Sequence, residues 1–461
     1  MSPSPAQLLP ETRRALIHRL ATGQVEGRAP SVVAAVVRDG QAVWADGWGA
    51  VDGRAPDADV QYRIGSITKI FTAVLVLRLR DEGLLALTDP LDKHLPGTVV
   101  GHATIGALLA HTAGLVAEPP GAWWERTPAE LRPELTDLLG SDPQIHPAGQ
   151  RHHYSNPGYA LLGALVERVR GRAWGDVLRR EVLEPLAMTR TTLLPVAPHA
   201  TGWAVHPWAD VLLAEPAVDT GLMAPAGQLW STAADLAKLA AFLIEGDERV
   251  LHPDTVARMR APMSPPETTG ADNAYGLGLQ LVRRDGRSLA GHTGSLPGFL
   301  ATVWVSPEDA LGAVVLGNVT AGLAVSALAA DLLDTVAQRE PRIPAPWRPL
   351  ASVDPQLLNL AGPWYWGPAT WVLRPSADGF LELAPLAGGG RGTRLRPLGD
   401  EEWEGLSGYF AGERLRIRRD AAGVVSHLDL GTFVFTRQPY DPTTPVPGGV
   451  DPAGWRPGQA P

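Results

Sequence analysis

The sequence predicts an α/β fold in which an antiparallel sheet is interrupted by an all-α insertion and followed by a small antiparallel β-barrel. Strand-like runs occur near both ends of residues 1–338, and helical patterns fill the middle, at about 84–230. A proline-rich linker at 339–350 precedes residues 351–440, where short alternating runs are broken by glycine turns. Several prolines in residues 441–461 predict a flexible tail.

The composition is that of a globular protein and excludes several function classes. With 461 residues, the chain is long enough for more than one hydrophobic core. Its net charge of −9 is spread without charge runs, which argues against a nucleic-acid or anionic-membrane partner. The absence of cysteine excludes disulfides, thiolate zinc sites and a cysteine nucleophile. Residues 1–20 show no signal-peptide core and no apolar run reaches about 18 residues, so we expect a cytoplasmic protein without a membrane span.

Local signals predict the first strands and the first central helix. Residues 31–38 and 41–48 are β-rich runs joined by an Asp-Gly dipeptide, which is a strong hairpin signal. A run with almost no helix breakers begins at Ser66 and closes at the Glu-Gly dipeptide 82–83, so it predicts a helix.

The remaining elements are predicted from periodicity and from turn residues. Helices are expected at 104–109, 159–170, 174–183, 232–243, 253–260 and 319–337. Strands are expected at 275–283, 288–292, 301–305 and 311–316, and in the C-terminal region at 370–373, 380–383, 414–418 and 431–435.

Ser66 and Lys69 are three residues apart at the start of a helical pattern, so their side chains can touch on one face. A serine hydroxyl becomes a nucleophile when a base takes its proton, and a lysine can be this base once its pKa is lowered. The chain has only three lysines, at 69, 93 and 238, and arginine could not serve because it keeps its proton. A capped helix with a solvated lysine is the alternative explanation.

A second motif consists of Tyr154 and Asn156, which flank a serine on a loop before a predicted helix. The tyrosine offers a phenol that can transfer a proton. The asparagine offers an amide that can orient a substrate carbonyl or a lysine. A simple helix-capping turn would explain the same residues without chemistry.

A third motif, Gly-His-Thr-Gly-Ser at 291–295, lies at the end of a predicted strand. Small residues there, including Thr293 and Gly294, let a substrate backbone lie against the strand edge. The backbone amide of Ser295 could complete an oxyanion hole with the amide of Ser66. His292 would supply a tunable positive charge, although a turn histidine without a role is the alternative.

The three motifs together resemble the penicillin-binding-protein and serine β-lactamase superfamily in their order and spacing. The resemblance covers about residues 6–337 and is supported by the segments 109–115, 184–189 and 275–278. The third motif begins with His292, where β-lactamases usually have a lysine. This histidine is typical of the class C-like branch, which contains D-stereospecific peptidases, esterases and some carboxypeptidases.

The resemblance implies that residues 1–338 form a catalytic domain that transfers acyl groups through an ester on Ser66, without a metal or cofactor. Ser66 would attack an acyl carbonyl while Lys69 and Tyr154 share its proton, and which of these two is the formal base stays open. Asn156 would orient the substrate amide, and His292 would hold an anion or polarise Tyr154.

Among the subfamilies, the chain most resembles stand-alone penicillin-binding-protein-type thioesterases, which release and cyclise nonribosomal peptides. The supporting features are a lipocalin-like C-terminal domain, the absence of a leader, and the segments 118–125 and 203–210. The resemblance implies a peptidyl thioester with a D-configured C-terminal residue, presented by a peptidyl carrier protein and closed by the peptide's own amine. Four tryptophans would form apolar walls that exclude water, or else pack the insertion against the sheet: Trp123, Trp124, Trp203 and Trp208.

Two other functions stay open. A cytoplasmic D-stereospecific peptidase, carboxypeptidase or esterase would use the same acyl-serine and differ only in what resolves it. A catalytically silent binding protein on this fold is the other alternative, and the presence of all three motifs argues against it.

Overall fold

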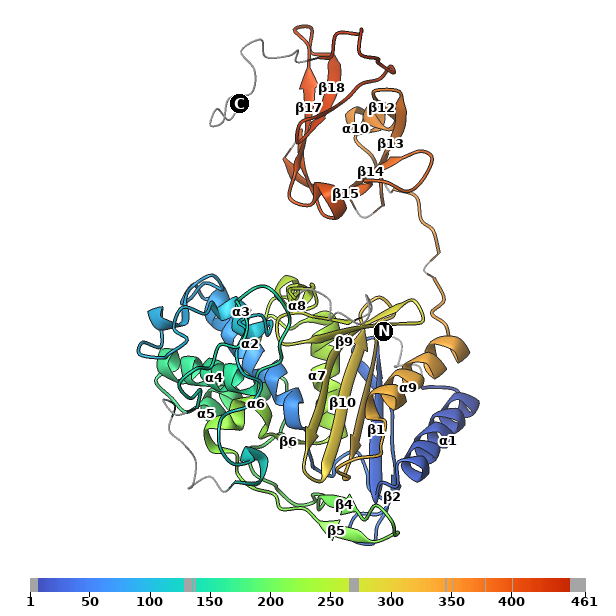
Figure 1. Ribbon diagram of the computed structural model, residues 1–461. Helices are drawn as coiled ribbons and strands as arrows, with labels where there is room; N and C mark the ends of the chain where they lie inside the picture. Colours follow the sequence, from blue (N-terminus) through green and yellow to red (C-terminus); the bar gives the residue numbers. More distant parts are fainter. Residues whose placement is uncertain are drawn as a thin grey trace. The chain divides into compact units, whose positions relative to one another are not determined.

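The computed structural model shows two compact units, Met1–Arg342 and Ile343–Pro461 (Figure 1). No helix in the part of the chain that it describes is long and apolar enough to cross a membrane. The described residues are 7–127, 135, 138–264, 273–344, 346–350, 352–377, 379–399 and 401–447.

The first unit is built on a seven-stranded antiparallel sheet of order β2-β1-β11-β10-β9-β8-β7. The N-terminal hairpin of β1 and β2 pairs with β11, so strands from the two ends of this unit are neighbours in one sheet (Figure 1). The strands are β1 (Ser31–Arg38), β2 (Gln41–Gly49), β7 (Asn273–Tyr275), β8 (Gln280–Arg284), β9 (Arg287–Leu296), β10 (Phe299–Ser306) and β11 (Leu311–Gly317).

Both faces of this sheet are covered, because alternate side chains of the central strands enter two different cores. In β1, Val33 and Ala35 belong to one core while Val32 and Ala34 belong to the other. Helices α1 (Pro10–Glu26) and α9 (Val325–Arg339) pack on the second core, and α7 (Ala233–Glu245) packs on the first (Figure 1). Central strands that are buried on both sides explain the nearly continuous apolar runs in the sequence.

The helical region packs against the α7 face of the sheet, and its central helix α2 (Thr68–Asp81) is buried on almost every side. It also contains two short antiparallel pairs of strands, β3 with β6, which are distant in sequence, and the hairpin of β4 and β5. These strands are β3 (Tyr62–Arg63), β4 (Trp203–Val205), β5 (Leu212–Ala214) and β6 (Trp230–Ser231). The helices are η1 (Gly65–Ile67), η2 (Leu91–Lys93), α3 (Ile105–Leu109), η3 (Trp124–Arg126), α4 (Asn156–Arg170), α5 (Trp174–Leu178), the π-helical turn η5 (Arg179–Leu183), η6 (Gly221–Met223), α6 (Ala224–Gly227) and α8 (Pro253–Met259).

The second unit is an eight-stranded antiparallel sheet that runs from β12 to β19 in chain order. A bridge between Tyr365 and Thr436 brings its two edge strands together, and Trp364, Leu383 and Phe435 are among the side chains that fill its interior. Its elements are α10 (Pro355–Leu360), β12 (Gly362–Trp366), β13 (Ala369–Pro375), β14 (Leu381–Pro385), β15 (Thr393–Gly399), β16 (Glu402–Gly405), η7 (Gly408–Phe410), β17 (Arg414–Arg419), β18 (Val425–Leu430) and β19 (Phe433–Phe435).

The predicted fold class is confirmed, and the differences are local. The strand expected at 275–283 is instead the β7–β8 hairpin, because Gly278 turns the chain with a φ of +81°. The helix expected from residue 319 starts only at Val325, after a turn that contains Gly322 at φ +101°. Most of the predicted tail, residues 448–461, lies outside the described residues.

We expect a chain truncated after Arg342 to stay folded, because neither core of the first unit contains a residue of the second. The purified fragment should melt cooperatively in a thermal scan followed by circular dichroism. It should also react at Ser66 with a fluorescent fluorophosphonate at the rate of the full chain. An aggregated or unreactive fragment would contradict this prediction.

Candidate active site

The predicted nucleophile and its lysine partner lie in direct contact. Ser66 is half-buried in the turn η1, immediately before α2, and Lys69 is fully buried in the first turn of α2. Lys69 Nζ lies 3.0 Å from Ser66 Oγ. The three-residue spacing therefore places the amine against the hydroxyl, and the solvated-lysine alternative does not describe this protein.

Lys69 makes two further hydrogen bonds, which determine how it can accept a proton. Its Nζ donates to Asn156 Oδ1 at 2.7 Å and to the Ala226 carbonyl oxygen at 2.7 Å. Both partners can only accept, so they use two of the lysine's hydrogens. In the neutral amine, the lone pair therefore points toward Ser66 Oγ. Burial lowers the pKa of Lys69 to about 7, against the opposing effect of nearby glutamates, so a substantial fraction is neutral near physiological pH.

Tyr154 adds a protonated phenol to Ser66, Lys69 and Asn156. These four residues form the Ser66 cluster. Its phenol lies beside the Ser66 side chain, and its ring centroid lies 4.8 Å from Lys69 Nζ. Burial raises the pKa of Tyr154 above its ordinary value, so the phenol keeps its proton at neutral pH.

The start of helix α4 positions Tyr154 and Asn156. Ser155 is the N-cap, and its Oγ accepts from the Gly158 amide at 3.1 Å. The backbone N–H of Asn156 donates to the Ala117 carbonyl oxygen at 2.9 Å. The backbone N–H of Ser155 donates to Nδ1 of the buried His111 at 3.0 Å. The cap residue lies between the two candidate residues, so the turn that caps α4 also places Tyr154 and Asn156 beside Lys69.

Strand β9 approaches the nucleophile so closely that only glycine fits at the contact. A Cβ added at Gly294 would lie 1.9 Å from the Ile64 carbonyl oxygen and 3.2 Å from the Ser66 amide nitrogen. A Cβ added at Gly65, where φ is +50°, would lie 2.7 Å from the Ser295 amide nitrogen. The contact brings the Ser66 and Ser295 backbones together, as a two-amide oxyanion hole requires.

His292 does not carry the positive charge expected of it. It is 1% exposed, and burial together with the neighbouring Lys69 charge lowers the pKa of His292 to about 3. Its Nδ1 lies 2.5 Å from the Thr293 carbonyl oxygen, so Nδ1 carries the hydrogen. Nε2 is then the acceptor for the Tyr275 hydroxyl at 3.0 Å. Both nitrogens of the neutral ring are occupied by these hydrogen bonds, which stabilise β9. The ring therefore cannot bind an anion. Thr293 donates its amide and hydroxyl to Gln280 Oε1.

The four tryptophans do not form one apolar wall around the site. Trp124 is buried beside the cluster, and its Nε1 donates to Glu118 at 2.7 Å. Trp123 is 54% exposed, and Trp203 is half-buried in β4, whose backbone lies at the β9–β10 turn. Trp208 is 91% exposed in the connection between β4 and β5, so the structure does not bring it to the site.

Glu118 is a site residue that the motifs did not reveal. It follows the supporting segment 109–115, but no spacing rule singles out an acidic residue there. Its Oε1 accepts from Asn156 Nδ2 at 2.7 Å, which places it two hydrogen bonds from Lys69. Tyr275 was also missed as a partner of His292, although it opens the supporting segment 275–278.

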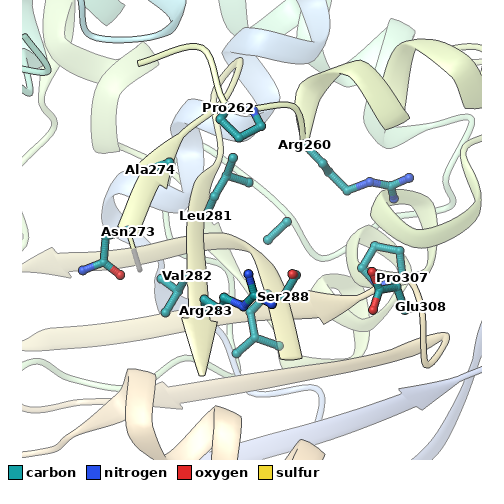
Figure 2. Close-up of a pocket in the computed structure, with 12 residues that line it drawn as sticks. Arg260, Pro262, Asn273, Ala274, Leu281, Val282, Arg283, Ser288, Pro307 and Glu308 are labelled. Atoms are coloured by element: carbon teal, nitrogen blue, oxygen red, sulfur yellow. The ribbon is translucent and has the colours of Figure 1, made fainter. Parts of the chain in front are cut away.

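Two cavities lie near the β7–β8 edge of the sheet. Figure 2 shows one of about 370 Å³, lined by Arg260, Leu281 and Glu308 among others, and none of the residues of the Ser66 cluster lines it. The other, of about 280 Å³, is lined by Tyr154 and Thr293 and adjoins the cluster. Among the described residues, no three His, Asp or Glu side chains are grouped to hold a metal ion.

Comparison with known proteins decides the family. The sequence profile of the family described as Beta-lactamase matches residues 14–338. The chain belongs to the Beta-lactamase family. This confirms the superfamily resemblance drawn from the three motifs. A second profile, described as a domain of unknown function (DUF7586), matches residues 353–437.

Individual relatives agree with this assignment. The chain is similar to beta-lactamase-like 1 of Homo sapiens, with 30% identity over 311 residues, 62% of this chain and 61% of the human protein. It thus spans about three fifths of that relative's length. The crystal structure of SurE has 25% identity and a TM-score of 0.59, covering 93% of this chain and 99% of SurE. A D-stereospecific amidohydrolase from Streptomyces sp. has 25% identity and a TM-score of 0.57, covering 69% of this chain and 97% of that one.

The rate of covalent labelling of Ser66 by a fluorescent fluorophosphonate should rise with pH through about 7 and then level off, because only neutral Lys69 can take the serine proton. Lys69→Arg should lose roughly a thousandfold in rate, since arginine stays protonated. Ser66→Ala is the unlabelled control. A wild-type rate that stays flat between about pH 5 and pH 9 would contradict the role of Lys69.

Gly65→Ala should slow labelling of Ser66 by roughly tenfold to a hundredfold, because the new Cβ displaces the Ser295 amide. Gly53→Ala is the matched control, since Gly53 also has a positive φ, +75°, but nothing lies within 4 Å of its Cβ position. The positive φ should cost each variant about 1 kcal/mol of unfolding free energy in denaturant melts, and Gly65→Ala should lose more because its Cβ meets the Ser295 backbone. Equal labelling rates in the two variants would show that the contact has no role in acylation.

Proposed function

We propose that this enzyme off-loads a peptidyl thioester with a D-configured C-terminal residue and closes it head to tail. The family makes it a serine hydrolase or acyltransferase, and the peptide cyclase is the specific form that we infer. The observation that carries the proposal is the cluster in which Lys69 Nζ lies 3.0 Å from Ser66 Oγ, with the Tyr154 phenol beside the same hydroxyl.

In the first step, neutral Lys69 takes the Ser66 proton as Oγ bonds to the thioester carbonyl carbon. The C–S bond then breaks, and the thiol leaves with a proton from Tyr154, which Lys69 replaces. Lys69 is the better base of the two, because the raised pKa of Tyr154 keeps its phenol protonated. The amides of Ser66 and Ser295 would stabilise the oxyanion.

In the second step, the peptide's own N-terminal amine attacks the ester on Ser66. The ester C–O bond breaks, the amine loses a proton to neutral Lys69, and Ser66 regains its hydroxyl hydrogen from Tyr154, which Lys69 reprotonates. The product is a ring that is one water lighter than the linear acid. If water attacks instead, the same intermediate gives the acid.

Several features support a D-configured peptide substrate. The neighbour from Streptomyces is a D-stereospecific amidohydrolase, and SurE has also been solved with D-Leu. The segments 118–125 and 203–210 resemble those of stand-alone thioesterases, and the first of them contributes Glu118 and Trp124 beside Asn156. A peptidyl carrier protein is the partner that this proposal implies.

The second candidate is a D-stereospecific peptidase or esterase that hydrolyses the same acyl-serine. The observation in its favour is the exposure of Trp123 and Trp208, at 54% and 91%. These rings do not form the dry wall that would protect an ester from water.

The two functions differ in product mass. A peptidyl thioester mimic ending in a D-residue should yield the ring, one water lighter than the acid, when incubated with the enzyme and weighed by mass spectrometry. The L-terminated mimic should react at least about a hundredfold more slowly if the pocket discriminates configuration, and Ser66→Ala should give neither product. Linear acid alone from every D-terminated peptide would remove the cyclase and leave the hydrolase.

A further inference from the structure

The Glu118 carboxylate accepts hydrogen bonds from two donors at the edge of the Ser66 cluster. Its Oε1 accepts from Asn156 Nδ2 and its Oε2 accepts from Trp124 Nε1, each at 2.7 Å. Although part of the Glu118 side chain is exposed, both donors belong to buried residues. A carboxylate with each oxygen bonded to a different fixed donor has one preferred orientation.

This carboxylate determines which way the Asn156 amide points. A carboxylate only accepts, so it must face the NH₂ end of the amide, which leaves Oδ1 toward Lys69 Nζ at 2.7 Å. The reverse orientation would place two acceptors together and direct an NH₂ group at the lysine. Glu118 therefore selects the orientation in which Asn156 binds a lysine hydrogen and leaves the lone pair for Ser66.

We propose that Glu118 is a positioning residue for acylation, which acts by orienting Asn156 against Lys69 and by placing a negative charge near the amine. The proposal rests on the acyl-serine step of the proposed function and does not depend on cyclisation. Its opposite is a structural role, in which Glu118 only holds the segment around Trp124.

Other groups around Lys69 do not duplicate this arrangement. The titratable neighbours are His111, His292, Tyr154 and Tyr159, which are uncharged at neutral pH, and the two carboxylates Glu118 and Glu125. Glu125 accepts from Trp123 Nε1 at 3.0 Å. Since Glu125 also carries charge near Lys69, Glu125→Gln is a matched control for charge without orientation.

The test is the rate of Ser66 labelling by a fluorescent fluorophosphonate across pH, on the full chain. Glu118→Gln should lower the plateau rate above the Lys69 pKa by about tenfold, because a glutamine oxygen cannot accept from both Asn156 and Trp124. The rising part of the pH–rate profile of Glu118→Gln should move to lower pH by roughly half a unit at low salt. The shift should be smaller at high salt, because an exposed charge is screened. Removing a negative charge favours the neutral amine, which gives this direction.

Glu125→Gln should shift the rising part of the profile in the same direction but keep the wild-type plateau. Trp124→Phe keeps the charge at residue 118 and frees only Oε2, so it should lower the plateau by less than Glu118→Gln and leave the rising part of the profile in place. A wild-type plateau in Glu118→Gln, or an equal loss in Glu125→Gln, would overturn the proposal. Unlabelled wild-type protein would instead contradict the acyl-serine step itself.

Discussion

The first unit depends on a buried amine that needs three partners. Lys69 lies in the buried first turn of α2 beside largely apolar side chains, where an unpaired ammonium would be strongly destabilising. Its partners are Ser66, Asn156 and the Ala226 carbonyl, which come from η1, α4 and α6. The same bonds that satisfy the amine therefore bring three separate elements of the helical region to one point. Burial also makes the lysine a usable base, so one constraint serves both packing and chemistry.

A second constraint joins the helical region to the sheet. Gly65 and Gly294 let η1 and β9 meet with backbone atoms in contact, and larger residues at either position would push the two layers apart. The neutral His292, which is hydrogen-bonded to Tyr275 and to the Thr293 carbonyl oxygen, then stabilises β9. An oxyanion hole formed by the Ser66 and Ser295 amides would thus depend on the junction between the two layers and not on either layer alone.

The parts of the site that follow local rules could be predicted from the sequence. Ser66 and Lys69 touch because three residues along a helix return to the same face, and the sheet follows from apolar runs at both ends of the unit. The charge of His292 could not be predicted, since it depends on burial by residues distant in sequence. Trp208 was misplaced because its segment forms a hairpin that carries it outward. Glu118 was missed because its partners, Asn156 and Trp124, are fixed only by tertiary packing.

The filled interior of the second unit limits what that unit can do. Its inward-facing side chains, such as Trp364 and Leu383, are buried against one another. A substitution at such a position would mainly lower the unfolding free energy of the second unit. New specificity in this unit would therefore be acquired most easily through its outward residues, so its surface can diversify between relatives while its centre stays constant.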